Sequence, residues 1–578
     1  MKPEIHSTSQ DEPTQRVSPV GDWFLKNKIQ CPGLTPGAKE IAGLTKDLSK
    51  RLGVLFYKKQ LPSIWVVFVG GTGTGKSTLF NAFCGKDLSK AGVERPKTCG
   101  PVLYVHEGQP IEQGYPFPSV HMERHSSEDN VSLPASGTPG EILLLEHRKK
   151  EWSEMVVADT PDLDSVEPEN RQIAEELCLL SDAVVFVTSQ EKYADEVPYK
   201  FLLKIVKEKI PYFFLVNKVQ DNLTREEIFD SLDTREIQFR KDRVWLIPCA
   251  ASNIYQWIAE HPNFRDFVST FSREFSPDAV SSLREMDHSR RTEELSLRVG
   301  RLMTLLEEED REAEQWLEKL HAISQEISQD LIKEQKARFT AQSREFLDSE
   351  IRRLFDKYDV LAKPRRFVTE FLLTPFRLLG FKKKDSLEAH RQALLKIRQQ
   401  MDMAPTQTAI EKFNRLVLEK LSPSDDDSAL FWKLRDPDMV MNDEEIKRHI
   451  WEEQDRLATW LEERFQELAD GIPRGKKWGI YSTSLLWGIL ILSFETAVGG
   501  GFSVLNALLD SVLAPLVTKG AMELFAYREI QKVARELGER YQQGLISAVR
   551  FQYNRYERGL ESLLTPVESL KVLHQSLI

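Results

Sequence analysis

The sequence predicts an α/β domain with a mostly parallel sheet and helices on both faces, followed by a long α-helical stalk or bundle. Short, almost continuous apolar runs lie between residues 60 and 255, as expected for parallel strands that are buried on both faces. A glycine-rich run separates the first of these strands from a helix. Beyond residue 266, apolar residues recur every three or four positions in long charged segments, which is typical of packed helices.

Length and composition set the broad class of the protein. A chain of 578 residues is too long for one compact core, so we expect several domains. Its five cysteines form no Cys-x-x-Cys pair, which favours a reducing, cytoplasmic location. The net charge of −11 argues against general attraction to nucleic acid, and we expect no nucleic-acid partner.

The apolar runs divide the chain into three parts. Residues 1–59 are predicted to be a disordered lead without a secretory signal, followed by an amphipathic helix from about Thr35 to Lys59. The α/β domain is predicted over 60–255 and the helical region over 256–578. The five strand candidates are residues 65–69, 155–158, 183–188, 212–216 and 244–248. The polar segment 108–140 contains no pattern that we can assign.

A phosphate-binding P-loop is predicted directly after the first strand. It consists of Gly70, Gly71, Thr72, Gly73, Thr74, Gly75, Lys76 and Ser77, with Thr78 next to it in the helix. Glycines let backbone N–H groups turn around a polyphosphate, and the helix adds its positive N-terminal end. We expect Lys76 to bridge the terminal phosphates and Ser77 to hold Mg²⁺. A purely structural turn would need this Gly-Lys-Ser sequence by accident.

Two more residues are candidates for the phosphate and metal site. Asp159 ends the run 155–158 and is expected to contact Mg²⁺ through water; a simple strand-end cap is the alternative. In the polar segment 94–101, Thr98 is expected to supply a hydroxyl or backbone contact to Mg²⁺, unless this segment is an ordinary loop. We therefore predict Lys76, Thr98 and Asp159 as catalytic residues, and Ser77, Thr98 and Asp159 as metal-binding residues.

The end of the strand 212–216 carries a candidate base-binding sequence. Asn217 and Lys218 are followed by Gln220 and Asp221, so the carboxylate falls one residue later than in an Asn-Lys-x-Asp sequence. A carboxylate accepts both guanine N1–H and N2–H, whereas a glutamine lacks the second oxygen. Guanine is thus the expected base, and an ATPase motor or chaperone is an alternative. After the last strand, residues 249–252 resemble a Ser-Ala-Lys segment whose backbone contacts guanine O6, which indicates Ala250 for this contact; a strand-end turn is the alternative.

In this order the motifs resemble the five nucleotide-binding motifs of the translation-factor-related GTPases. The resemblance covers about residues 60–255, and residues 95–98 with the paired glycines are most similar to the dynamin-like and Era/septin-type branches. It implies an α/β P-loop GTPase domain, called the G domain below, that binds GTP or GDP with Mg²⁺. Septins lack a helical half, and Era-type proteins carry a small RNA-binding module instead, so the architecture favours the dynamin-like branch.

One departure from the Ras-like pattern bears on hydrolysis. Asp162 and Leu163 stand where these relatives have a Gly-Gln pair whose glutamine positions the attacking water. A leucine cannot orient water. Dynamin-like GTPases without this glutamine usually complete the site through dimerisation or another switch residue. The resemblance therefore implies slow basal hydrolysis that is stimulated when two G domains meet.

The helical region shows two amphipathic stripes and two apolar segments. The stripes are Trp316, Leu320, Ile323, Ile327 and Leu331, and Ile446, Ile450, Leu457, Leu461, Phe465 and Leu468, the second after a capped start at 442–445. Residues 478–518 contain two apolar runs, each short of the roughly twenty residues that span a bilayer. A re-entrant hairpin at the cytoplasmic face and a buried helical hairpin are both consistent with this segment. Aromatic residues flanked by cations at 363–384 suit an anionic lipid surface or a packed helix.

These observations lead to two functional hypotheses. The first is a GTPase whose nucleotide state controls G-domain dimerisation and membrane engagement by the helical region, with another copy of itself and anionic lipid as partners. The second is a soluble GTP-binding switch that docks a protein partner and has negligible turnover.

Overall fold

The computed structural model contains two compact units, of which the first is built on a sheet. The structure describes residues 29–61, 63–89, 100–117, 120–126, 141–163, 168–193, 195–220, 224–228, 241–249, 255–357, 404–470 and 521–577. Unit 1 contains Glu40–Leu306 and Thr565–Ile578, and unit 2 contains Gln30–Lys39 and Glu307–Leu564.

Unit 1 has an eight-stranded sheet that is mostly parallel, as predicted. Its strands are β1 (Ile64–Gly70), β2 (Val102–His106), β3 (His121–Ser126), β4 (Glu141–His147), β5 (Met155–Asp159), β6 (Ala183–Ser189), β7 (Tyr212–Val219) and β8 (Val244–Pro248). Their order in the sheet is β3-β4-β2-β5-β1-β6-β7-β8. Among these strands β2 pairs with β5 in antiparallel orientation, and the other neighbouring pairs are parallel.

The prediction of five strands misses β2, β3 and β4. Strand β3 lies in the polar segment 108–140, and its side chains are half-buried or exposed because it forms an edge of the sheet. Arg124 of this strand pairs with Glu112 and with Glu146 of β4 instead of entering the core. An edge strand with such side chains has no apolar run, and the hydrophobic pattern therefore gave no signal.

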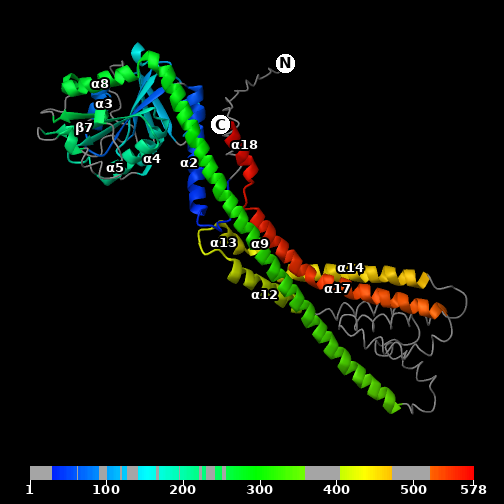
Figure 1. Ribbon diagram of the computed structural model, residues 1–578. Helices are drawn as coiled ribbons and strands as arrows, with labels where there is room; N and C mark the ends of the chain where they lie inside the picture. Colours follow the sequence, from blue (N-terminus) through cyan, green and yellow to red (C-terminus); the bar gives the residue numbers. More distant parts are fainter. Residues whose placement is uncertain are drawn as a thin grey trace, which may run out of the picture. The chain divides into compact units, whose positions relative to one another are not determined.

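Helices cover both faces of the sheet (Figure 1). One face packs against α2 (Ala38–Gln60), α4 (Pro168–Leu180) and α5 (Glu196–Lys207). The other packs against α3 (Lys76–Cys84), α7 (Tyr255–Glu260) and α8 (Pro262–Glu274). In β1, Trp65, Val67 and Val69 enter the first core, whereas Ile64, Val66 and Phe68 enter the second. This alternation holds β1 between the two layers of helices, and the carboxyl end of the strand leads directly into the P-loop.

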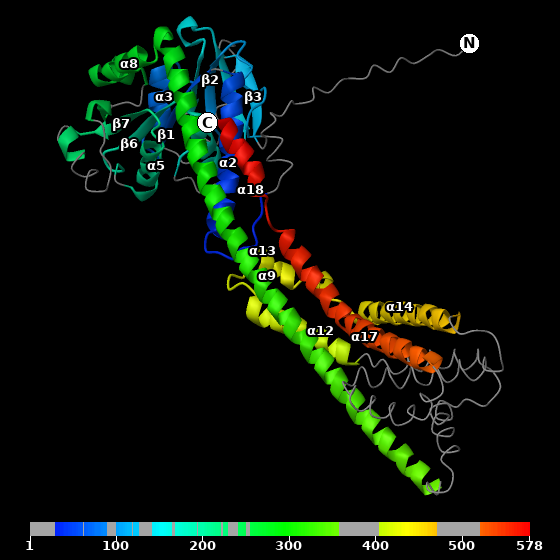
Figure 2. The same cartoon turned by 45° about the vertical axis from the view of Figure 1, so that its right-hand side comes forward.

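Two further helices complete unit 1. The first part of α9 (Pro277–Lys357) runs alongside α2, and Arg301 of α9 pairs with Glu40 of α2 through two nitrogen–oxygen contacts of 2.8 and 2.9 Å. The last helix, α18 (Val567–Leu577), also lies against α9 (Figure 2). There, His574 Nε2 is 3.1 Å from Ser296 Oγ.

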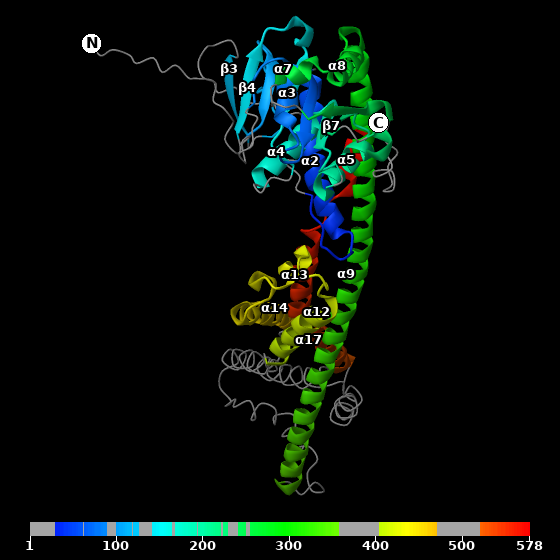
Figure 3. The same ribbon diagram turned by 90° about the vertical axis from the view of Figure 1, so that its left-hand side faces the viewer.

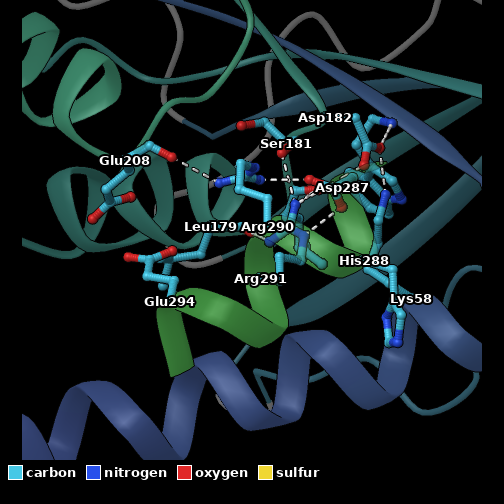
Figure 4. Close-up of polar contacts among 12 residues, drawn as sticks. Lys58, Leu179, Ser181, Asp182, Glu208, Asp287, His288, Arg290, Arg291 and Glu294 are labelled. Atoms are coloured by element: carbon cyan, nitrogen blue, oxygen red, sulfur yellow. Dashed lines mark hydrogen bonds and ion pairs between the residues drawn. The ribbon is translucent and has the colours of Figure 1, made fainter. Parts of the chain in front are cut away.

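A buried carboxylate joins α2 to the amino ends of β1 and β6 (Figure 4). Asp182, directly before β6, accepts a 2.6 Å hydrogen bond from the backbone N–H of Trp65 and another from Lys58 Nζ of α2. Burial lowers the pKa of Lys58 and raises that of Asp182, because it disfavours both charges. Each charge is tolerated there because the other lies beside it.

Arg291 of α9 extends this charge cluster to the end of α4 (Figure 4). Its guanidinium donates to the carbonyls of Leu179 and Ser181, and it pairs with Asp287 at 2.5 Å. Burial alone would raise the pKa of Asp287, but Arg291, Arg290 and Lys58 outweigh it and hold this pKa well below its usual range. A cation at the carbonyl end of a helix is also favoured by the helix dipole.

Unit 2 is a helical bundle (Figure 3), and the burial of its side chains confirms the first predicted stripe. Trp316, Leu320, Ile323, Ile327 and Leu331 of α9 are all buried. They share this core with residues of α12 (Ala404–Leu421), α13 (Ala429–Leu434), α14 (Asp443–Asp470) and α17 (Ala521–Glu561).

The predicted cap of α14 is also confirmed. Asn442 Oδ1 accepts from the backbone N–H of Glu445, and Glu445 Oε2 accepts from the backbone N–H of Asn442. In the second stripe, Ile446 and Leu457 are buried, while the side chains of Leu461, Phe465 and Leu468 lie outside what the structure describes.

One carboxylate holds the segment before α2 within unit 2. Glu309 is 1% exposed and accepts three backbone hydrogen bonds of 2.7 to 3.0 Å, from Gly33, Leu34 and Thr35. Its fourth bond, at 2.6 Å, comes from the Thr35 hydroxyl. Four donors converge on one charged group, so the charge is compensated without a cation.

We expect the Glu309→Gln variant to lower the stability of unit 2. A glutamine replaces one acceptor oxygen by an NH₂ group that faces backbone donors, at a cost of about 3 kcal/mol. Thermal unfolding and limited proteolysis would measure this, with the exposed neighbour Glu307→Gln as the matched control. Equal unfolding midpoints for the two variants would contradict the role given to Glu309.

We expect the Asp287→Asn variant to unfold more easily at pH 7 by about 3 kcal/mol, because it leaves Arg291 buried with less charge compensation. Since the folded pKa of Asp287 is depressed, its contribution is present above the unfolded value of about 4 and is lost as pH falls below it. The gap between wild type and variant should therefore shrink between pH 5 and pH 3. A pH series of unfolding midpoints would test this, with the exposed Glu285→Gln as control; a gap independent of pH would refute it.

Candidate nucleotide-binding site

The P-loop has the backbone conformation that its glycines allow. It joins β1 to α3, and Gly73 and Gly75 have φ angles of 73° and 87°, a region that other residues rarely adopt. A Cβ atom on Gly75 would lie 2.2 Å from Asn217 Nδ2, and one on Gly70 would lie 2.2 Å from the Val187 carbonyl oxygen. These positions therefore require glycine on steric grounds as well.

Side chains from outside the P-loop hold three of its carbonyl oxygens. Lys192 Nζ donates to Thr72 O at 3.0 Å, Lys218 Nζ to Gly73 O at 2.7 Å and Asn217 Nδ2 to Thr74 O at 2.9 Å. The C=O and N–H of one peptide point in opposite directions. Holding the carbonyls of Thr72 and Thr74 on the outside therefore directs the N–H groups of Gly73 and Gly75 to the other side, where an anion can accept from them.

Lys76, the first residue of α3, is almost completely buried. Its ammonium lies 2.8 Å from Asp159 Oδ1 at the end of β5, and it also donates to the Thr160 carbonyl. Its exposed fraction is 3% and that of Asp159 is 0%. Asp162 is farther away, with 4.0 Å between its Oδ1 and Lys76 Nζ. The structure thus brings together the predicted phosphate-binding lysine and the predicted metal-site carboxylate.

Ser89 is a partner of Asp159 that sequence analysis missed. Its hydroxyl donates to Asp159 Oδ2 at 2.7 Å. Asn81 of α3 positions it, because the Asn81 side chain accepts from the N–H groups of Leu88 and Ser89 and donates to the Ser89 carbonyl. A buried asparagine in a helix, just before a short polar loop, was the one signal available.

The donor set fits Mg²⁺. Hydroxyl and carboxylate oxygens are the ligands that this ion prefers, and Ser77 and Asp159 supply one of each. Within the described part of the chain, no three His, Cys, Asp or Glu side chains are grouped so as to hold a metal by themselves. That is expected where substrate phosphates and water complete the coordination.

Leu163 follows Asp162 and belongs to the core. Its side chain is 2% exposed, and its backbone N–H donates to the Gly70 carbonyl at 3.1 Å. It lies among the buried residues on the α4 side of the sheet. Its side chain therefore cannot hold a water molecule, as the sequence indicated.

The remaining predicted residues are placed as follows. Gly71 and Thr78 are buried in the P-loop and α3, Ser77 is half-buried, and Asn217 and Lys218 lie at the end of β7. Thr98, Asp221 and Ala250 lie outside the described residues, as do segments 363–384 and 478–518. The structure also adds Lys192 to the P-loop contacts, a residue with no motif of its own.

Comparison with known proteins points to one family. Residues 66–219 match the family model described as the Dynamin family. An uncharacterized protein in the xynA 3' region of Caldicellulosiruptor sp. (strain Rt8B.4) is 28% identical over 191 residues, which cover 32% of this chain and 47% of that protein. The transmembrane GTPase fzo-1 of Caenorhabditis elegans is 27% identical over 181 residues, 28% of this chain and 23% of that protein. The chain thus matches about half of the first relative's length and about a quarter of the second.

Two solved chains from a study of an oligomerised bacterial dynamin pair in the sensing and tethering of membranes are also similar. They are 15% and 14% identical, each with a TM-score of 0.27, and the alignments cover 92% and 89% of this chain and 85% and 80% of theirs. Of the branches that the motifs resemble, the matched family model is that of the dynamins. Over residues 66–219 the G domain of this chain is thus similar to dynamin-type GTPase domains.

Proposed function

We propose that this chain binds GTP with Mg²⁺ and hydrolyses it to GDP and phosphate. The P-loop carries this proposal, because its carbonyls are held on the outside and Lys76 is buried at its base. Residues Gly70 to Thr78 would bind the phosphates, and the Lys76 ammonium would pass from Asp159 to the terminal phosphates. A buried cation stabilises negative charge more strongly there than in water.

Ser77, Thr98 and Asp159 are the residues that would hold Mg²⁺. When bound, the ion neutralises charge on the β- and γ-phosphate oxygens. The hydrogen bond from Ser89 orients the Asp159 carboxylate. Asn217 and Lys218 support the P-loop, and we assign guanine contacts to Asp221 and to the backbone of Ala250.

Stimulation by a second G domain is part of the proposal. The buried Leu163 leaves the position of the usual water-orienting side chain without a polar group. A group supplied by another copy would complete the site when two G domains meet.

Membrane engagement is assigned to the helical region, at the cytoplasmic face. The support is the apolar segment 478–518, the cation-flanked segment 363–384 and the similarity to a protein named as a transmembrane GTPase. No helix in the described ranges is long and apolar enough to cross a bilayer.

The buried Leu163 also supports a second candidate, a GTP-binding switch with negligible turnover that docks a protein partner. Such a protein would bind GTP tightly at the same P-loop and would show neither stimulation by concentration nor lipid binding.

The Lys76→Ala variant should lose GTP turnover by on the order of 100-fold or more, because the buried ammonium is removed from the phosphates. Phosphate release would be measured at saturating GTP. Lys200→Ala, on the surface of α5, is the matched control and should retain full activity. Full activity of Lys76→Ala, with the variant folded by circular dichroism, would overturn the site assignment.

Turnover per molecule should rise at least several-fold with protein concentration, and rise again with anionic vesicles. A dimer brings in the group that Leu163 does not provide. Phosphate release over a hundredfold concentration series would measure this. A turnover rate per molecule that changes neither with protein concentration nor with vesicles would instead favour the switch with negligible turnover.

A further inference from the structure

The loop after β6 contacts two parts of the nucleotide site at once. It begins at Gln190, after Ser189, which is paired in register with Asn217 of β7. A turn closes within this loop through a 2.9 Å bond from the Lys192 N–H to the Ser189 carbonyl. The Lys192 side chain holds the Thr72 carbonyl of the P-loop.

Gln190 holds both ends of the segment Asn217–Gln220. Its backbone N–H donates to the Asn217 carbonyl at 3.3 Å, and its side-chain Oε1 accepts from the Gln220 N–H at 2.7 Å. The first contact uses the backbone N–H of Gln190 as the donor. The second uses the carbonyl oxygen of its side chain as the acceptor.

The segment that Gln190 holds has strained backbone. Lys218 has a φ angle of 57°, which residues other than glycine adopt rarely, and the pairing of β7 with β8 shifts register between Val216 and Val219. Such a conformation persists only where neighbouring groups fix it. Here it aims Asn217 and Lys218 at the P-loop.

We propose that Gln190 is a positioning residue for base discrimination: through the Asn217 carbonyl and the Gln220 N–H it fixes the segment that directly precedes Asp221, the residue to which we assign a guanine contact. The inference rests on the proposed binding of guanine nucleotide. Gln190 would thus be a determinant of base specificity outside the Asn-Lys-containing sequence. It lies in the same loop as Lys192, which holds the Thr72 carbonyl of the P-loop. Gln190 touches no base; it acts through the main chain of another strand.

The geometry specifies which substitutions keep this function. Gln190→Glu retains an acceptor oxygen at the same distance from the backbone, so this variant keeps the contact with the Gln220 N–H. Gln190→Asn retains an acceptor but is one methylene too short. Gln190→Ala removes the acceptor, and Glu191→Ala is the matched control in the same loop because Glu191 is exposed.

Titration of the full chain with fluorescent GDP and ADP in Mg²⁺ tests the proposal. We expect the ratio of the ADP to the GDP dissociation constant to fall about tenfold in Gln190→Ala and Gln190→Asn, and to stay at the wild-type value in Gln190→Glu and Glu191→Ala. An unchanged ratio in Gln190→Ala, or equal weakening of both nucleotides, would overturn it, the latter because it indicates a merely structural role.

Two controls keep the outcomes apart. Thermal unfolding shows whether each variant is folded, and if Gln190→Ala is not, the comparison of Gln190→Asn with Gln190→Glu decides. The titration of the wild-type protein tests the proposed function itself. If the wild-type protein does not bind GDP more tightly than ADP, the proposed function fails, whatever the variants show.

Discussion

The hydrogen bonds from Lys192, Lys218 and Asn217 to the P-loop carbonyls are the constraint on which the proposed nucleotide site depends. They come from the carboxyl ends of β6 and β7, which a parallel sheet places beside the end of β1. Without them the P-loop peptides could rotate and present oxygen to an anion. The fold therefore orients the backbone of the proposed phosphate site through side chains that need not contact the phosphate.

The same strands are also joined at their opposite ends. Asp182 connects the start of β6 to the backbone of Trp65 in β1, and it does so with a buried charge that Lys58 compensates. Strand β1 is thus held at its amino end by this carboxylate and at its carboxyl end by the contacts of the P-loop. A buried charge of this kind is costly unless paired, so it specifies one arrangement of α2 and the strands more than it adds stability.

Sequence patterns predicted those parts of the structure that depend on local side-chain chemistry. The P-loop sequence, the strands β1, β5, β6, β7 and β8 and the cap at Asn442 each follow from residues near one another in the chain. Strand β3 could not be found because its polar and charged side chains form no apolar run, whereas β2 and β4 were missed although both are apolar and largely buried. Ser89, Gln190 and Lys192 were not predicted because their partners are distant in the sequence. Gln190 and Lys192 also contact backbone atoms, and such contacts do not require a particular residue type in the partner.

Hydrogen–deuterium exchange of the full chain, with a non-hydrolysable GTP analogue and Mg²⁺ or with the adenine analogue, tests the central claim most directly. We expect the guanine analogue to slow exchange in peptides covering Gly71 to Ser77, since their N–H groups then bind phosphate, and in those covering Asn217 to Gln220. The adenine analogue at the same concentration should leave both segments unchanged. Exchange at Gly71 to Ser77 that saturating GTP analogue does not slow would contradict the account.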